Sequence, residues 1–186
     1  MRRWSLCAAT LLVMAFALPL AAQQRLLPAQ SEIGFTSRQM GVPVQGRFRS
    51  FDAKVEFDPR RPEAARIAMS IDLASVALAS AGTESELAKP GWFDTRHFPQ
   101  ASFATTSVRP TGPGRFDVAG KLTIKGTTRE LVVPVTLLQS GADLTASGSF
   151  AIHRLDYRIG DGDWSDTSLV ADEVQVKFRL ALTGGP

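Results

Sequence analysis

Apolar and polar residues alternate along most of the chain with a period of two. This period is typical of strands that bury one face, because successive side chains of a strand point to opposite sides of the sheet. Nine runs show it, over residues 33–37, 44–48, 53–57, 65–73, 101–105, 116–121, 131–137, 144–152 and 174–182. Short connections rich in Gly, Pro and Asp separate the runs, as expected for turns. The pattern predicts an all-β domain with antiparallel strands.

The number of runs and their short connections favour an antiparallel sandwich or a barrel. A closed barrel has no unpaired strand edge, which an open sheet would expose. An outer-membrane barrel also alternates, but it turns its apolar residues outward on longer strands with aromatic girdles. The runs here are shorter and the chain ends Gly184-Gly185-Pro186. We therefore expect the apolar face to lie inside.

One segment interrupts the alternation with a helical signature. Residues 83–86, Thr-Glu-Ser-Glu, have the form of a capping box, with Thr83 as N-cap and Glu86 three residues later. Pro90 and Gly91 follow and end the helix. We expect one short helix inserted among the strands.

The N-terminus has a different pattern from the rest of the chain. Two arginines follow Met1, an apolar run covers residues 6–20, and Ala21-Ala22 precedes two glutamines. This order of basic, apolar and small residues is typical of a cleavable secretory signal peptide. The apolar run is shorter than the about 20 residues of a membrane-spanning helix. We predict a signal peptide at 1–22 and a single mature domain at 23–186.

Removal of the signal peptide changes the composition of the domain. Its only cysteine, Cys7, is lost, so disulfides and thiolate chemistry are excluded from the mature chain. Loss of Arg2 and Arg3 takes two charges from the formal net charge of +3 and leaves +1. A charge this small gives no reason to expect a nucleic-acid partner.

The sequence offers little for catalysis. A hydrolase needs a nucleophile, a base and a group that orients the base. His97 and His153 are the only histidines, and no Gly-x-Ser-x-Gly motif is present. His153 follows the inward Ile152, so we expect it to face away from the core. We predict no enzyme and no catalytic residue.

Two polar clusters have features of ligand sites. The acidic stretch 161–166 has the spacing of a calcium loop, but Asp166 stands where the sharp turn needs glycine. We expect a solvated loop there, and no metal site or cofactor. Lys121, Lys125 and Arg129 surround a Lys-Gly turn. They form either an ordinary solvated hairpin tip or a contact for a phosphate head group.

Several segments together resemble the YceI-like family of exported bacterial proteins, also called polyisoprenoid-binding. They are Ile33-Gly34-Phe35 through Gly46-Arg47-Phe48, Phe51-Asp52-Ala53 with Val55-Glu56-Phe57-Asp58, Trp92-Phe93-Asp94 with His97-Phe98-Pro99-Gln100-Ala101-Ser102-Phe103, Gly120-Lys121-Leu122-Thr123-Ile124-Lys125-Gly126-Thr127-Thr128, Phe150-Ala151-Ile152-His153-Arg154, and Ile159-Gly160 with Ala171-Asp172-Glu173-Val174. The order and spacing of these segments carry the resemblance, which covers nearly the whole mature chain.

The resemblance implies an elongated, lipocalin-like antiparallel β-barrel of about eight strands. It also implies a long apolar channel that binds an isoprenoid or another long-chain amphiphile. We expect ligand contacts from inward-facing apolar residues and from the segment after the helix: Phe35, Phe48, Val55, Met69, Ile71, Trp92, Phe93, Phe98, Phe103, Phe150 and Phe178.

Two questions about this channel stay open at the level of sequence. Trp92, Phe93 and Phe98 lie either at the channel mouth, where they gate it, or in a plug that completes the core. Large aromatics and small residues such as Gly46 and Gly120 alternate in the apolar runs. Such a mixture is compatible with an open tunnel or with a filled core, and the resemblance favours the tunnel.

We therefore expect a periplasmic protein that holds a long-chain lipid for transport or storage. The alternative is a non-catalytic scaffold for a membrane redox partner, such as a b-type cytochrome, or for a stress-response partner. Transient contact with a membrane or a membrane protein, and a homodimer, fit either function.

Overall fold

The computed structural model describes residues 23–184; the predicted signal peptide, residues 1–22, lies outside the described residues. The described part contains one α-helix, α1 (Ala81–Leu87), and eleven strands. The strands are β1 (Gln23–Leu26), β2 (Glu32–Gln39), β3 (Val42–Phe48), β4 (Phe51–Glu56), β5 (Arg66–Asp72), β6 (Val76–Ala77), β7 (Gln100–Gly112), β8 (Arg115–Ile124), β9 (Thr127–Ser140), β10 (Asp143–His153) and β11 (Glu173–Thr183).

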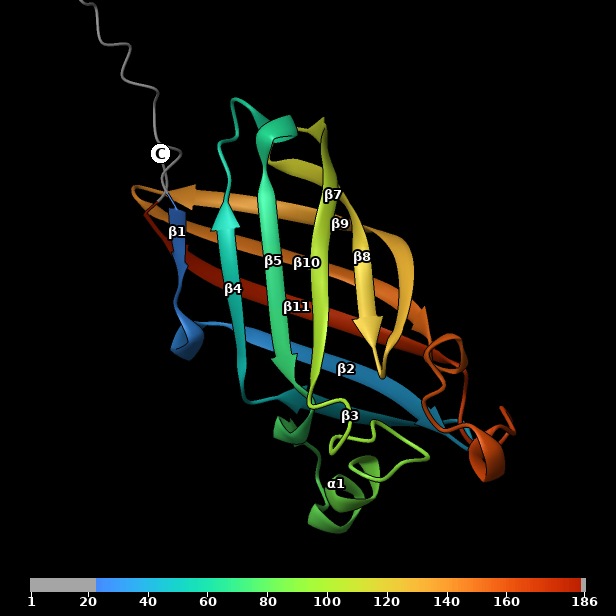
Figure 1. Ribbon diagram of the computed structural model, residues 1–186. Coiled ribbons are helices and arrows are strands. Elements are labelled where there is room, and N and C mark those ends of the chain that lie inside the picture. Colours follow the sequence, from blue (N-terminus) through green and yellow to red (C-terminus); the bar gives the residue numbers. More distant parts are fainter. Residues whose placement is uncertain (1–22, 185–186) are drawn as a thin grey trace, which may run out of the picture.

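Eight of these strands close into an antiparallel barrel. Their order is β1-β4-β5-β7-β8-β9-β10-β11, and β11 pairs again with β1. The short β1 closes the ring because Gln24 is paired with Val55 of β4 while Leu26 is paired with Leu182 of β11. Figure 1 shows β4, β5, β7 and β8 crossing in front of the more oblique β9, β10 and β11. The predicted fold class, a closed antiparallel barrel with one short helix, is confirmed.

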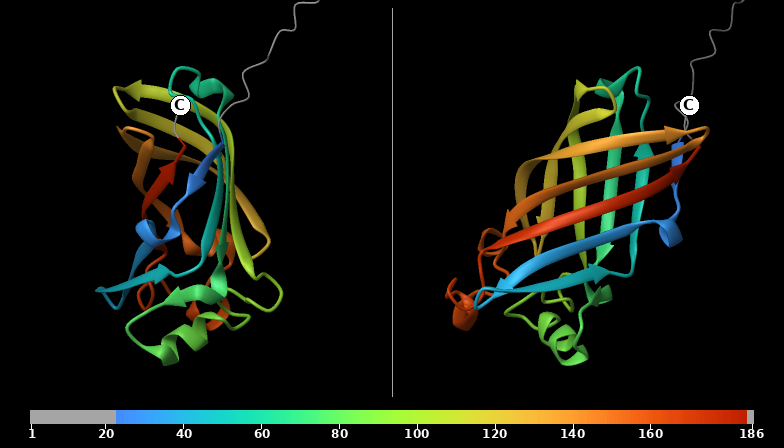
Figure 2. Two further views of the ribbon diagram at one scale, coloured as in Figure 1. Left: turned by 90° about the vertical axis from the view of Figure 1, so that its left-hand side faces the viewer. Right: turned by 180° about the vertical axis from the view of Figure 1, so that it is seen from behind.

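The remaining strands lengthen the wall at one end. After a 3₁₀ turn at Pro28–Gln30, β2 pairs with the first half of β11. β3 pairs with β2, and β6 pairs with β3, so the sheet extends beyond β11. Helix α1 lies at this same end, the lower end of the barrel in Figures 1 and 2.

All nine predicted runs form strands, and two further strands were missed. β1 has four residues and β6 has two, which is too short for a period of two to be visible. β1 depends on tertiary contacts instead. The buried Gln24 accepts a hydrogen bond from the Phe57 N–H at Oε1 (2.8 Å) and donates from Nε2 to the Phe57 carbonyl (3.0 Å).

The helix begins earlier than its predicted N-cap. Ser80 is the N-cap, so Thr83 lies inside the helix and the prediction of Thr83 as cap is wrong. The physical reason is that the acidic residue bonded to the segment before the helix is Glu84, not Glu86. Its Oε1 accepts a hydrogen bond from the backbone N–H of Leu78 (2.8 Å). Glu86 instead contacts Lys89, with 2.5 Å between Oε2 and Nζ.

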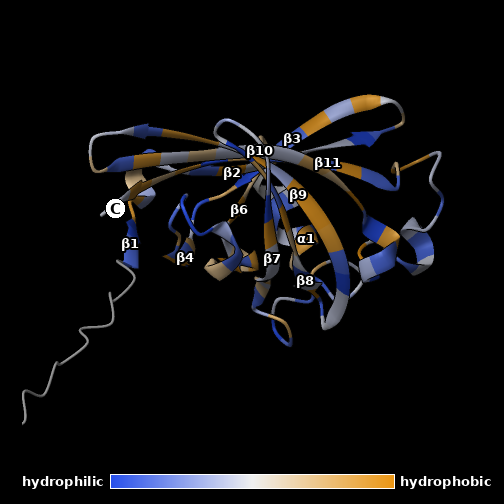
Figure 3. Cartoon of the chain, turned by 90° about the horizontal axis from the view of Figure 1, so that it is seen from above, coloured by the Kyte–Doolittle hydropathy of each residue, from blue (hydrophilic) through white to orange (hydrophobic). Residues whose placement is uncertain are grey.

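Apolar residues alternate with polar ones along the strands, as the hydropathy colours in Figure 3 show. The inward residues form two clusters of buried side chains. One contains Val55, Phe116 and Leu144 in the middle and upper barrel, and the other contains Leu73, Trp92 and Tyr157 near the α1 end. The functional site lies between and within these clusters.

Candidate functional site: an apolar channel in two cavities

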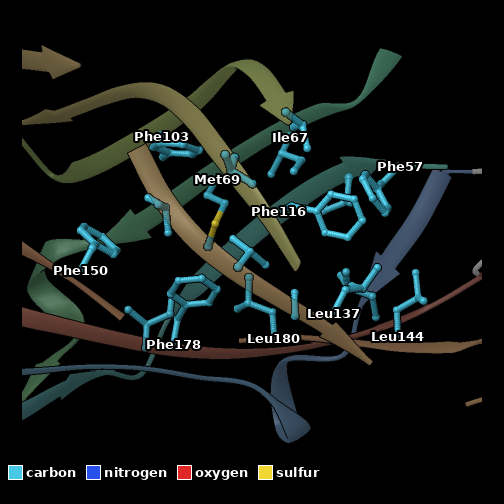
Figure 4. Close-up of a pocket in the computed structure, with 18 of the residues that line it drawn as sticks. Phe57, Ile67, Met69, Phe103, Phe116, Leu137, Leu144, Phe150, Phe178 and Leu180 are labelled. Atoms are coloured by element: carbon cyan, nitrogen blue, oxygen red, sulfur yellow. The ribbon is translucent and has the colours of Figure 1, made fainter. Parts of the chain in front are cut away.

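The first cavity lies inside the barrel and has a volume of about 140 Å³. Every residue that lines it is aliphatic, aromatic or methionine. Figure 4 shows Met69, Phe103 and Phe178 extending from different strands toward a common space, with Phe57 and Phe116 together at one end. The rings of Phe57 and Phe116 meet edge to face at 5.2 Å between centroids. This cavity has no polar side chain in its lining, so it suits a hydrocarbon chain.

The second cavity lies at the α1 end and is larger, about 400 Å³. It is bounded by β2, β3, α1 and the connection between β10 and β11. Most of its lining is apolar, but Ser37, Gln39, Thr83, Glu86 and Arg154 also contribute. The two cavities share Ile33, Ile71, Leu122, Phe150 and Val176 in their linings. They therefore adjoin, with an apolar compartment at one end and a mixed compartment at the other.

Ten of the eleven predicted ligand-contact residues line these cavities. The smaller cavity is lined by Val55, Met69, Ile71, Phe103, Phe150 and Phe178, and the larger by Phe35, Phe48, Ile71, Trp92, Phe93 and Phe150. Trp92 and Phe93 are both buried in the core cluster of the α1 end and both line the larger cavity. These two residues thus complete the core and bound the channel at once.

Phe98 is the exception, because it packs against the turn between β8 and β9. A Cβ atom placed on Gly126 would lie 2.8 Å from the Phe98 ring. Phe98 is not among the lining residues of either cavity. The sequence pattern could not show this, since Phe98 belongs to a connection without a strand period.

The same turn revises both interpretations of Lys125. Lys125 is buried, donates from Nζ to the carbonyl oxygen of Arg158 (2.6 Å) and lies 3.7 Å from Asp161 Oδ1. Its φ of 47° and the φ of 72° at Gly126 make a two-residue hairpin turn with both residues left-handed. Lys125 is therefore a buried structural cation that contacts Arg158 and Asp161, and it is not part of a solvated tip.

Three glycines explain how large aromatics and an open interior coexist. Rings of Phe35, Phe103 and Phe178 lie against glycines, which are Gly46, Gly120 and Gly148 respectively. A Cβ on these glycines would come within 2.3, 2.3 and 2.6 Å of the ring. The small residues do not themselves form the tunnel. They let each ring lie against the barrel wall, which leaves the lumen free.

Arg154 is a fully buried cation in the lining of the larger cavity, and sequence reasoning did not select it. The sequence does contain a sign of its position: Arg154 follows Phe150 and Ile152 at a spacing of two residues, directly after β10, so it points to the same inner face. Its guanidinium donates five hydrogen bonds of 2.6–3.1 Å to backbone carbonyls, those of Ile159, Gly160, Trp164, Val170 and Ala171. Burial lowers the pKa of Arg154 and nearby Asp172 opposes that shift; an arginine nonetheless stays charged in a protein.

The two histidines and the carboxylates of the acidic loop are not among the residues that line the channel. His97 and His153 are exposed and pair with Asp94 (2.9 Å) and Asp172 (3.1 Å). In the acidic stretch, Asp166 accepts hydrogen bonds from the hydroxyl and the N–H of Ser168, which lower the pKa of its carboxyl. Residues 23–184 contain no group of three or more His, Cys, Asp or Glu placed to hold a metal ion. In that same range, no helix is both long and apolar enough to cross a membrane.

An eight-stranded antiparallel barrel around an apolar interior defines the lipocalin-like class, whose barrels can hold one small ligand. The chain belongs to the YceI-like domain family, which matches residues 25–182. The predicted family is thereby confirmed.

Two relatives found by sequence are UPF0312 proteins. A UPF0312 protein of Pseudomonas fluorescens is 34% identical over 125 residues, covering 61% of this chain and 63% of that protein. A UPF0312 protein of Ectopseudomonas mendocina is 32% identical over 100 residues, covering 54% and 52%. The matched region thus spans between about half and two thirds of the length of these relatives.

Solved structures show the same fold. BcnA of Burkholderia cenocepacia is 42% identical with a TM-score of 0.82, covering 84% of this chain and 98% of BcnA. A polyisoprenoid binding domain from Saccharophagus degradans, implicated in plant cell wall breakdown, has a TM-score of 0.71 at 19% identity, covering 89% and 99%. A Campylobacter jejuni YceI protein has a TM-score of 0.69 at 15% identity over the whole of both chains.

Proposed function

We propose that this protein binds one long-chain isoprenoid or fatty amphiphile inside its barrel, for transport or storage, and catalyses no reaction. The observation that carries the proposal is the smaller cavity, whose lining is entirely apolar and continues into the larger cavity. The polyisoprenoid binding of the Saccharophagus degradans domain, which shares the fold, supports the same ligand class.

The physical chemistry of such a channel favours long chains. Burial of one CH₂ group contributes about 0.8 kcal/mol, whereas association costs roughly 4–15 kcal/mol before any net affinity remains. A chain of about ten carbons offsets only the lower part of that cost. A longer chain that fills both cavities binds with few polar contacts, and its length and shape decide its affinity.

We further propose that the protein acts in the periplasm after cleavage behind Ala22. Support comes from the buried Gln24 of β1, whose side chain bonds to the Phe57 backbone. A cut behind Ala22 keeps this residue, whereas a cut two residues later would remove it.

A pair of substitutions on β10 tests whether the channel binds the ligand. Ala146 lines the smaller cavity, and Ala151 on the same strand is exposed. Ala146→Phe fills the space for the chain, so titration with a fluorescent C16 fatty acid should show at least tenfold weaker binding. Ala151→Phe adds the same ring outside and should bind as the unaltered protein does. Unchanged binding by Ala146→Phe in a folded protein would exclude the channel as the site.

The scaffold alternative makes a different prediction. A barrel that serves only to present its outer surface to a membrane partner needs no ligand inside. It would take up the fatty acid neither before nor after substitution, and the two variants would behave alike.

A further inference from the structure

Trp92 carries a polar atom that has no partner. Its indole Nε1 is the only buried side-chain nitrogen or oxygen atom in residues 23–184 that lacks a hydrogen-bond partner. The residue is 7% exposed and lines the larger cavity. A buried N–H without a partner costs about 1–3 kcal/mol, and native structures contain few of them. An acceptor that enters the larger cavity would give this N–H a partner.

The surroundings of Trp92 fix its ring. A Cβ on Gly160 would lie 3.0 Å from Cζ3 and 3.2 Å from Cη2 of Trp92, and 2.6 Å from Arg154 Nη1. The benzene edge of the indole therefore packs against Gly160 beside the guanidinium. On another side, the ring of Trp164 lies 5.7 Å away between centroids, tilted by 47°. Trp164 also lines the larger cavity and is 40% exposed.

Arg154 is the obvious alternative donor for a ligand, but its capacity is used. A guanidinium has five N–H groups, and all five of Arg154 donate to backbone carbonyls. Its positive charge remains and favours an electron-rich group nearby, although it has no N–H left to offer. The free donor in the lining of the same cavity is the indole N–H of Trp92, a ring whose benzene edge lies near this guanidinium.

We propose that the Trp92 indole N–H donates a hydrogen bond to an oxygen atom on the head group of the bound chain. This inference rests on the proposed function and narrows its ligand class to long chains that end in a hydroxyl, carboxyl, ester or phosphate oxygen. A pure hydrocarbon leaves the N–H unpaired. The arrangement also sets the direction of the ligand, with its head in the larger cavity near Arg154 and its tail in the smaller, wholly apolar cavity.

The indole proton itself reports the bond. We would record ¹H–¹⁵N spectra of the exported protein and assign the Trp92 and Trp164 indole resonances from Trp92→Phe and Trp164→Phe variants. With 1-hexadecanol bound, we expect the Trp92 indole proton to move downfield. With hexadecane bound, which has the same chain and no oxygen, we expect no downfield movement. An unmoved Trp92 resonance in the hexadecanol complex, or equal movement with both ligands, overturns the proposal.

Affinities give a second readout that a merely structural role would not change. A neutral hydrogen bond of ordinary net strength corresponds to roughly a two- to tenfold change in affinity. Trp92→Phe should lower the preference for hexadecanol over hexadecane by that factor, whereas Trp164→Phe should preserve this preference. Equal weakening of both ligands by Trp92→Phe means that Trp92 only packs, and contradicts the hydrogen bond alone. Binding of neither ligand to the unaltered protein contradicts the proposed function as well.

Discussion

Single residues decide how much room the channel has. Gly46, which lies opposite Phe35 in the β2–β3 pairing, is the clearest case, because the three atoms nearest to a Cβ there belong to the side chains of Phe35 and Leu78. At Gly120 and Gly148 a backbone carbonyl is among the three nearest atoms. Gly46 therefore controls the position of the Phe35 ring.

Gly46→Ala should narrow the larger cavity. The new methyl group displaces the Phe35 ring toward the lumen, so the fatty acid binds more weakly by a factor of about three to thirty, equivalent to about 0.7–2 kcal/mol. Isothermal titration measures the effect. Gly91→Ala is the matched control, since a Cβ there meets nothing within 4 Å. If the two variants bind the fatty acid equally well, the Phe35 ring does not set the width of the larger cavity.

Arg154 holds the connection between β10 and β11 to the barrel. Arg154→Met keeps much of the volume but leaves buried carbonyls without donors, so it should destabilise the protein by at least about 3 kcal/mol. Urea unfolding measures the loss, and hydrogen exchange should rise first in residues 155–172. Arg109→Met is the control. Arg109 is exposed and pairs with Asp117 at 2.8 Å, and loss of a surface pair costs less than about 1 kcal/mol. Equal losses would refute a special role for Arg154.

Among the elements, β1 has only four residues, but the closure of the barrel depends on it, because it joins β4 to β11. Gln24→Ala removes two hydrogen bonds to the Phe57 backbone and should cost about 1–3 kcal/mol. The exposed neighbour Gln23 provides the control, Gln23→Ala. Thermal unfolding of both variants distinguishes them, and coincident midpoints would show that the side chain of Gln24 does not secure the closure.

Strands that bury one face over five or more residues can be predicted from the sequence, whereas elements that depend on tertiary contacts cannot. Alternation located the nine long strands because each buries one face, and it placed most of the channel residues correctly on that face. It could not detect β1 or β6, whose existence depends on pairing with distant strands. The capping box misplaced the start of α1, since the side chain of Glu84 bonds to Leu78 instead of a helical N–H. Phe98 and Lys125 were misjudged because tertiary packing, not periodicity, decides which residues a turn buries.

At the scale of the whole molecule, the two adjoining cavities make the barrel selective for length. In a series of fatty alcohols from C8 to C18, affinity should rise by up to about 0.8 kcal/mol for each added CH₂. The increase should stop once the chain fills both cavities, because further methylenes find no apolar wall. Competition against a fluorescent fatty acid measures the series. An affinity independent of length would contradict burial of the chain.

The central claim is that the barrel carries a long-chain lipid, and extraction tests it most directly. The protein would be exported, purified without detergent and extracted with organic solvent, and the extract would be analysed by mass spectrometry against an Ala146→Phe sample prepared in the same way. We predict about one long-chain isoprenoid or fatty amphiphile per unaltered protein and a clear depletion in the variant. Protein that is repeatedly free of lipid, and that takes up none of the fatty acid in titration, would contradict the claim.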